Sequence, residues 1–260
     1  MLIRCPAKLN LFLSVGPIDH RGYHPLRTIF QAVSLYDELH IEPAKELGFE
    51  CDDPSIPAEN TVTKAARLMM EVADFPPIHV RLVKRIPSEA GLGGGSSDAA
   101  GIIRAAKQLM SAPMPEHERK AIAKSIGADV PFFLLGGRAR GEGYGEKLTP
   151  LPSPNPPEWY VIAQPSDLCN TKSAYQRLDE KPYEWRDFPE DDILYNDFER
   201  VAPCGSLDLI ERLQVHGAKD AGLTGSGSAV FGRFADEDLA KRAEAKMKDE
   251  APFAVAVHSL

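Results

Sequence analysis

The chain has 260 residues, with 43% apolar and 26% charged residues, which are ordinary values for a globular protein with an ample core. Its net charge of −8 and the lack of a Lys/Arg-rich run argue against binding to nucleic acids or anionic membranes. An anionic small substrate is still compatible with this charge, because local positive groups can bind it. No apolar run approaches the roughly 18 residues of a membrane span, and no apolar signal-peptide core is evident. The four cysteines are widely scattered and show no metal-binding spacing. We therefore expect a cytoplasmic protein with free thiols.

The hydrophobic pattern predicts strands and helices mixed along the whole chain. In the first half we expect strands at 9–15 and 78–84, a helix at 60–72, and a further helix after residue 98. In the second half we expect strands at 159–164, 229–234 and 253–258, and helices at 207–213 and 239–247. This is an α+β layout with mostly short strands.

One break in composition divides the two halves. The segment 150–157 contains five prolines in eight residues, which can continue neither a helix nor a central strand. We predict two domains, 1–150 and 151–260, with the boundary at this segment. The alternative is a long surface loop inside a single domain.

The most informative stretch is the glycine-rich loop at 89–101. Gly91, Gly93, Gly94 and Gly95 run into two serines and then into a helical pattern. Backbone without Cβ atoms can approach a ligand closely, and a helix N-terminus favours an anion. The loop therefore predicts a phosphate site, although it lacks the lysine of a Walker A loop. The alternative is a glycine-rich turn with a serine cap.

Two polar side chains interrupt the apolar strand at 9–15. Lys8 and Asn10 are two residues apart, so they share one strand face. Asp129 lies in an apolar stretch at 127–133, where a buried carboxylate needs a cationic or hydrogen-bonding partner. If Lys8 is that partner, the pair can activate a hydroxyl. The alternatives are a solvent-facing strand edge for the first two residues and a capping role for Asp129.

Two further stretches are weaker signals. A second loop of glycines and hydroxyl residues at 222–229 offers donors for another anionic group, or forms a plain hairpin turn. The neighbours Tyr23 and His24 can clasp a planar base, although an exposed pair of this kind is common.

Together these stretches resemble the GHMP small-molecule kinases. The three matching motifs lie at 6–8, 91–100 and 224–228, and the stretches 22–26, 127–132, 145–150 and 196–199 match one branch of the family. The resemblance spans nearly the whole chain. It implies a two-domain α+β fold, in which the N-terminal domain resembles domain 2 of ribosomal protein S5 and the C-terminal domain is ferredoxin-like, with the active site in the cleft.

The resemblance also implies a reaction. In the matching branch, ATP phosphorylates the 2-hydroxyl of the methylerythritol part of a CDP-linked substrate, a step of the non-mevalonate isoprenoid pathway. Asp129 corresponds to the catalytic base, and Lys8 to the lysine that polarises the hydroxyl and steadies that base. Mg²⁺ is expected to bind through phosphates and water, so no protein metal site is predicted. We expect a monomer or weak homodimer.

Binding roles transfer by the same resemblance. The residues expected to contact ATP are Asn60, Lys84, Pro87, Gly91, Leu92, Gly93, Gly94, Gly95, Ser96 and Ser97. Those expected to contact the substrate are Asn10, Tyr23, His24, Phe30, Thr171, Tyr175, Gly225 and Ser226. Among them, Tyr23 and Tyr175 are predicted to stack on the two faces of the cytosine, and His24 to bond its edge.

The chain departs from the family pattern at a few positions. Cys169 and Asn170 precede Thr171 where the family often has Val-Ser, which affects the predicted substrate contacts of this segment. Asp98 stands where the family often has asparagine, and we expect little consequence. Two other readings are another GHMP kinase, acting on homoserine or a mevalonate derivative, and a non-enzymatic module that uses the S5-like fold to bind RNA.

Overall fold

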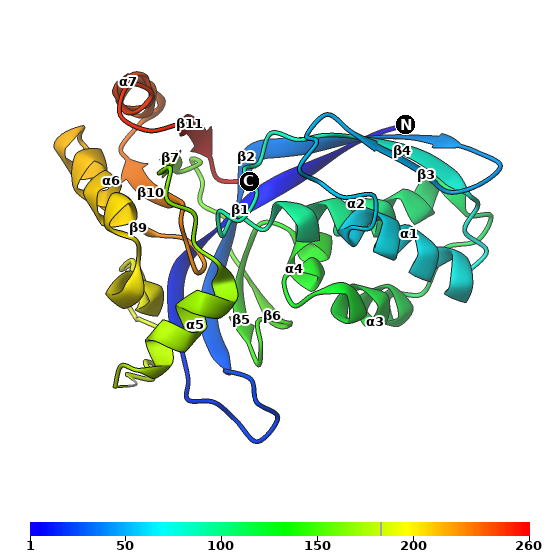
Figure 1. Cartoon of the computed structure of the whole chain (residues 1–260), viewed down its shortest axis with the longest axis horizontal. Coiled ribbons are helices and arrows are strands. Elements are labelled where there is room, and N and C mark those ends of the chain that lie inside the picture. Colours follow the sequence, from blue (N-terminus) through cyan, green and yellow to red (C-terminus); the bar gives the residue numbers. More distant parts are fainter. Residues whose placement is uncertain (183) are drawn as a thin grey trace. The chain divides into compact units, whose positions relative to one another are not determined.

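The computed structural model describes residues 1–182 and 184–260, and their contacts divide them into two compact units (Figure 1). Unit 1 contains Met1–Ala7, Leu35–Ser88 and Gly93–Leu135, and unit 2 contains Lys8–Ser34, Glu89–Leu92 and Gly136–Leu260. The long strands β1 (Leu2–Val15) and β2 (Leu26–Pro43) each contribute residues to both units. The units are therefore interleaved in sequence, and the domain boundary at 150/151 stays a prediction.

Unit 1 combines strands with four helices. The second half of β2 pairs antiparallel with β4 (Ile78–Val83), which pairs parallel with β3 (Gly48–Cys51). The helices are α1 (Thr61–Val72), α2 (Gly94–Leu109), α3 (Glu116–Ile126) and α4 (Val130–Leu135), and α2 contacts the other three (Figure 1). A Cβ at Gly101 of α2 would lie 2.6 Å from both Cys5 Sγ and Leu39 Cδ1. Glycine at this position thus lets α2 pack directly on the strands.

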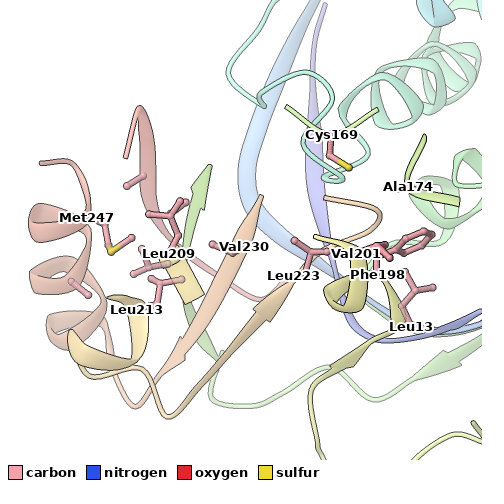
Figure 2. Close-up of a cluster of buried hydrophobic side chains, with 14 of the residues drawn as sticks. Leu13, Cys169, Ala174, Phe198, Val201, Leu209, Leu213, Leu223, Val230 and Met247 are labelled. Carbon is pink, nitrogen blue, oxygen red and sulfur yellow. The ribbon is translucent and has the colours of Figure 1, made fainter. Parts of the chain in front are cut away.

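Unit 2 contains a four-stranded antiparallel sheet in the order β11-β7-β10-β9. Its strands are β7 (Trp159–Gln164), β9 (Asp220–Leu223), β10 (Val230–Phe234) and β11 (Phe253–His258). The helices α6 (Cys204–Val215) and α7 (Glu237–Met247) pack on it. Figure 2 shows the resulting core, in which Leu209, Leu213 and Met247 meet Val230 of the sheet.

The rest of unit 2 surrounds the first half of β2 and the end of β1. Strand β5 (Arg138–Glu142) pairs with β2 and with β6 (Lys147–Leu151), and β8 (Tyr195–Asn196) pairs with β1. Helix α5 (Thr171–Asp179) and a 3₁₀ helix (Asp197–Val201) complete the unit. Pro150 lies inside β6, where its missing N–H is tolerated because β6 pairs with β5 along one side.

The predicted bounds agree best with the structure for the short, regular elements. Strands β7 and β11 have the predicted bounds, and α1 and β4 differ from prediction by one residue at an end. Strand β1 begins at Leu2 instead of residue 9, and the 18-residue β2 was not predicted. Within the described part of the chain, no helix is both long and apolar enough to cross a membrane.

Candidate active site

The predicted site residues belong to both units, and each group is described separately. Unit 1 holds Asn60, Lys84, Pro87, Gly93, Gly94, Gly95, Ser96, Ser97 and Asp129. Unit 2 holds Lys8, Asn10, Tyr23, His24, Phe30, Gly91, Leu92, Thr171, Tyr175, Gly225 and Ser226.

Lys8 is buried within β1. Its Nζ donates to Asn10 Oδ1 at 2.5 Å and to Gly91 O at 2.5 Å, and it lies 5.9 Å from the centroid of the Phe30 ring. Only 3% of Lys8 and 4% of Asn10 are exposed, so the alternative of a solvent-facing strand edge is wrong. The two acceptors fix the position of the ammonium group.

Asn10 connects β1 to the second glycine loop. Its Oδ1 also accepts from the backbone N–H of Gly225 at 3.0 Å, and its Nδ2 donates to Thr28 Oγ1 at 2.7 Å. Its backbone N–H donates to Thr224 Oγ1 at 3.1 Å. Because every polar atom of the side chain has a partner, Asn10 holds Lys8 and the 222–229 loop in one arrangement.

The two glycine loops touch within unit 2. Gly91 has φ +75°, and a Cβ there would lie 2.2 Å from Thr224 O. Gly225 has φ +57°, and a Cβ there would lie 2.9 Å from Gly91 O. Both positions therefore require glycine for close backbone approach as well as for backbone conformation. Asn196 Nδ2 donates to Gly225 O at 2.8 Å and holds the second loop from β8.

In unit 1 the first glycine loop becomes a helix without a side-chain cap. Helix α2 starts at Gly94 after Gly93 at φ +74°, and it has no side-chain cap. Helices α3 and α6 also lack such a cap, whereas α1, α5 and α7 are capped by Asn60, Asn170 and Asp236. Ser97 Oγ is buried and finds no hydrogen-bond partner among the described residues. These donors suit an anionic ligand at the start of α2.

The side chain of Asn60 has a local role. Its Oδ1 accepts from the N–H groups of Val62 and Thr63 at 2.8 and 3.2 Å, in a capping box with Thr63. Its Nδ2 donates to Pro57 O at 2.8 Å. Contact between Asn60 and ATP stays a prediction.

Lys84 and Pro87 line a pocket of about 400 Å³ in unit 1. The pocket lies between residues 52–54 and 84–88. Both residues were predicted to contact ATP, so the pocket is a candidate place for part of the nucleotide.

Behind this pocket lies a buried charge cluster. Lys84 Nζ donates to Asp37 Oδ2 and lies 3.3 Å from Asp98 Oδ2. Asp37 Oδ1 accepts from the N–H groups of Arg85 and Ile86 at 2.6 and 2.8 Å. Asp98 Oδ1 is buried without a partner among the described residues. Burial and the neighbouring Asp37 outweigh Lys84 and raise the pKa of Asp98 to about 7.

The expectation that an aspartate at position 98 has little consequence stays a prediction, and this cluster shows what it must accommodate. An asparagine there would carry no charge, whereas Asp98 adds a second carboxylate next to a single lysine. Burial of that carboxylate changes its protonation near neutral pH.

Asp129 immediately precedes α4 and is partly exposed. Its carbonyl accepts from the N–H of Phe132 at 3.1 Å. Its expected partner Lys8 belongs to the other unit, so their pairing stays a prediction.

The predicted base-binding residues lie together in unit 2. The His24 and Tyr175 rings stack with centroids 5.1 Å apart and an interplanar angle of 26°, and Tyr175 meets Phe198 edge-on at 4.9 Å. Tyr23 is 65% exposed, and its ring lies 5.6 Å from that of Tyr144. The structure thus pairs Tyr175 with His24, while stacking of cytosine between Tyr23 and Tyr175 stays a prediction.

The two hydroxyls predicted to contact the substrate are also neighbours. Thr171 Oγ1 and Ser226 Oγ are 2.9 Å apart, and Thr171 begins α5, the helix that contains Tyr175. This contact joins the second glycine loop to α5.

Comparison with known proteins decides the family. A protein from Solibacter usitatus named 4-diphosphocytidyl-2-C-methyl-D-erythritol kinase is 37% identical over 280 residues, covering 99% of this chain and 88% of the relative. A crystal structure of 4-(cytidine 5'-diphospho)-2C-methyl-D-erythritol kinase matches with a TM-score of 0.87 and 35% identity, covering 100% of this chain and 99% of the other. The chain belongs to the 4-diphosphocytidyl-2-C-methyl-D-erythritol kinase family.

Family models give the same result at the level of the superfamily. The model for the GHMP kinase N-terminal domain matches residues 60–137, and that for the GHMP kinase C-terminal domain matches residues 206–252. The predicted two-domain α+β GHMP kinase fold is confirmed, and membership of this kinase family makes the chain a phosphotransferase. A homoserine kinase from Cytophaga hutchinsonii has a TM-score of 0.71 at 19% identity, which shows a common fold alone.

Several residues of this family member were missed by sequence reasoning. Asp37, Thr28 and Asn196 position Lys84, Asn10 and Gly225 through side-chain hydrogen bonds. Each bond joins segments that are distant in sequence, so no local spacing marks them. Among these three residues, only Asn196 could have been found from the sequence, because it lies in the stretch 196–199 that resembles the family.

Proposed function

We propose that this chain phosphorylates the 2-hydroxyl of 4-diphosphocytidyl-2-C-methyl-D-erythritol with ATP, in the non-mevalonate pathway to isopentenyl diphosphate. The observation that carries the proposal is the identity of 35–37% to kinases of that name over nearly the whole chain. The structural counterpart is the buried Lys8, which bonds Gly91 of the first glycine loop and shares the acceptor Asn10 Oδ1 with Gly225 of the second.

The chemistry is an in-line phosphoryl transfer. The substrate oxygen forms a bond to the γ-phosphorus, and the bond from that phosphorus to the bridging oxygen of ADP breaks. In this proposal Asp129 accepts the hydroxyl proton. Lys8 stabilises the charge that develops on the attacking oxygen, because Asn10 and Gly91 hold its ammonium in place.

The start of α2 supplies the phosphate site. The N–H groups of Gly94, Gly95 and Ser96 and the Ser97 hydroxyl are placed to donate to phosphate oxygens. No group of three or more His, Cys, Asp or Glu side chains among the described residues is placed to hold a metal ion. In this proposal Mg²⁺ would be held mainly by the phosphates and water, and it would neutralise part of the phosphate charge.

The stacked His24 and Tyr175 suit the cytidine end of the substrate. A ring face supports base stacking in general, and a histidine nitrogen can select the base through its edge. The proposal includes a cytoplasmic location, where the ATP pool lies, and a monomer or weak homodimer.

An acceptor panel tests this function. ATP turnover is measured with 4-diphosphocytidyl-2-C-methyl-D-erythritol, homoserine and mevalonate at equal concentrations. We expect kcat/KM for the CDP-linked acceptor to exceed the others by at least about 10³-fold, because a site that bonds a base edge rejects acceptors without one. Comparable turnover of homoserine or mevalonate would assign the chain to another GHMP kinase. Salt-sensitive RNA retention on filters, without turnover, would favour the RNA-binding reading.

A further inference from the structure

The segment between α5 and β8 packs on the loop that contains Tyr23 and His24. Trp185 of this segment lies directly on Gly16, since a Cβ at Gly16 would be 1.5 Å from Trp185 Cζ3 and 1.9 Å from Cε3. The backbone of Gly16 is not left-handed, so it is the Trp185 ring that excludes any side chain there.

Gly16 in turn holds His24. The loop closes where Gly16 N–H donates to Pro25 O at 2.8 Å, and the Gly16 carbonyl lies 2.9 Å from His24 Nδ1. A carbonyl can only accept a hydrogen bond, so Nδ1 carries a proton. The other ring nitrogen, Nε2, lies 3.4 Å from Asp179 Oδ1, so both ring nitrogens of His24 face oxygen acceptors of the protein.

Trp185 is itself fixed from the strands of unit 2. The Arg27 guanidinium carbon lies 4.5 Å from the Trp185 ring centroid, and Arg27 Nη1 donates to Arg186 O at 3.2 Å. The N–H of Arg186 donates to Ser14 Oγ at 2.9 Å. The indole therefore has one orientation, stacked by a cation and resting on Gly16.

We infer that Trp185 is a positioning residue of the base subsite, which acts through Gly16 to hold the His24 imidazole in one tautomer and one plane. The inference rests on the proposed function. It extends that function to specificity: His24 and Asp179 held in one arrangement present one fixed set of hydrogen-bonding atoms to a base edge, and the edges of cytosine and uracil differ.

Three variants test the inference. Trp185→Ala removes the ring, Trp185→Phe keeps a planar apolar group, and Phe188→Ala is a matched control in the same segment. The Phe188 ring lies 5.9 Å from the Phe12 ring and 4.9 Å from the Arg140 guanidinium, whereas the three atoms nearest to a Cβ at Gly16 all belong to Trp185. All variants are checked for folding by thermal unfolding, and Trp185→Leu replaces Trp185→Ala if the latter does not fold.

The readouts are the Kd values for CMP and UMP by calorimetry, and KM and kcat with the CDP-linked substrate. We expect Trp185→Ala to weaken CMP binding about tenfold, which is about 1.4 kcal/mol. The ratio of CMP to UMP affinity should fall, while kcat at saturation and the KM for ATP stay near wild type. Trp185→Phe should recover most of the loss, and Phe188→Ala should stay within about twofold. Unchanged CMP affinity and selectivity in Trp185→Ala, or an equal loss in Phe188→Ala, overturns the inference.

A spectroscopic readout separates this inference from the proposed function. If the wild type does not phosphorylate the CDP-linked substrate, the proposed function fails. The His24 ring nitrogens can still be followed by ¹⁵N NMR. We expect a protonated Nδ1 in the wild type and in Phe188→Ala, and a mixture of tautomers in Trp185→Ala. The same single tautomer in Trp185→Ala shows that Trp185 does not position His24.

Discussion

Lys8 of unit 2 and Lys84 of unit 1 both have side chains that are largely buried, and their surroundings differ. The Lys8 ammonium donates to Asn10 Oδ1 and to the carbonyl of Gly91 in the first glycine loop. Lys84 instead lies against the carboxylates of Asp37 and Asp98. Burial lowers the pKa of Lys84, but the two carboxylates outweigh it and raise the pKa overall. Burial of a lysine alone therefore does not identify a catalytic group.

The largest effects are expected at Asp129 and Lys8. Asp129→Asn keeps the shape of the side chain but cannot accept a proton, so kcat should fall by about 10²–10⁴-fold. Lys8→Met should also lose turnover, and the double variant should lose less than the product of the two single losses, because the residues act as a unit. Steady-state kinetics at saturating substrate measure this. Near-normal turnover of Asp129→Asn would remove it as the base.

Lys84→Met should mainly lower the stability of the folded protein. Removing one partner of a buried ion pair leaves uncompensated charge, which costs about 3–5 kcal/mol. The free energy of unfolding in urea measures the loss, and Lys120→Met, which breaks the exposed ion pair with Glu116, is the matched control. A Lys84→Met protein as stable as Lys120→Met would show that the buried cluster does not depend on the Lys84 charge.

The sequence predicted the residues near Lys8 better than those near Lys84. Lys8 and Asn10 stand out because they are two residues apart in an apolar strand, and Gly91 belongs to a dense run of glycines. Lys84 depends on Asp37, which is 47 positions away in a strand that the pattern did not reveal. The contact between His24 and Tyr175 also joins distant segments, so its geometry required the structure.

A smaller effect is expected at Gly94. A Cβ at this position would lie 3.0 Å from Lys84 Nζ and 3.1 Å from Ile86 Cγ2, so Gly94→Ala crowds a packed cluster. Overpacking of this kind costs about 1–3 kcal/mol, and here it should also raise the KM for ATP. In the control Gly95→Ala, the nearest atom would be the Thr61 hydroxyl oxygen at 3.2 Å, the end of a small side chain. Equal stability and ATP kinetics in the two variants would contradict the account of a tightly packed Lys84 cluster.

The effect of Asp98→Asn is expected to depend on pH, because burial and the neighbouring Asp37 raise the pKa of Asp98 to about 7. Asp98 keeps its proton in the folded protein at pH values where the unfolded chain has lost it. Stability is therefore fully present below the ordinary aspartate pKa and is lost as pH rises through about 7. Asp98→Asn should gain stability relative to wild type between about pH 5 and pH 8. Urea unfolding of both proteins at the two pH values measures this gain. A stability difference between Asp98→Asn and wild type that does not change with pH would show that Asp98 does not titrate in this range.

The most direct test of the proposed function is the product of a single reaction, followed by ³¹P NMR. The wild type is incubated with ATP, Mg²⁺ and 4-diphosphocytidyl-2-C-methyl-D-erythritol, and Lys8→Met serves as the control. The account predicts one new phosphate monoester on the 2-hydroxyl of the methylerythritol part, formed in equal amount with ADP, and little product with Lys8→Met. Inorganic phosphate as the only new signal, or a monoester on another hydroxyl, would contradict it.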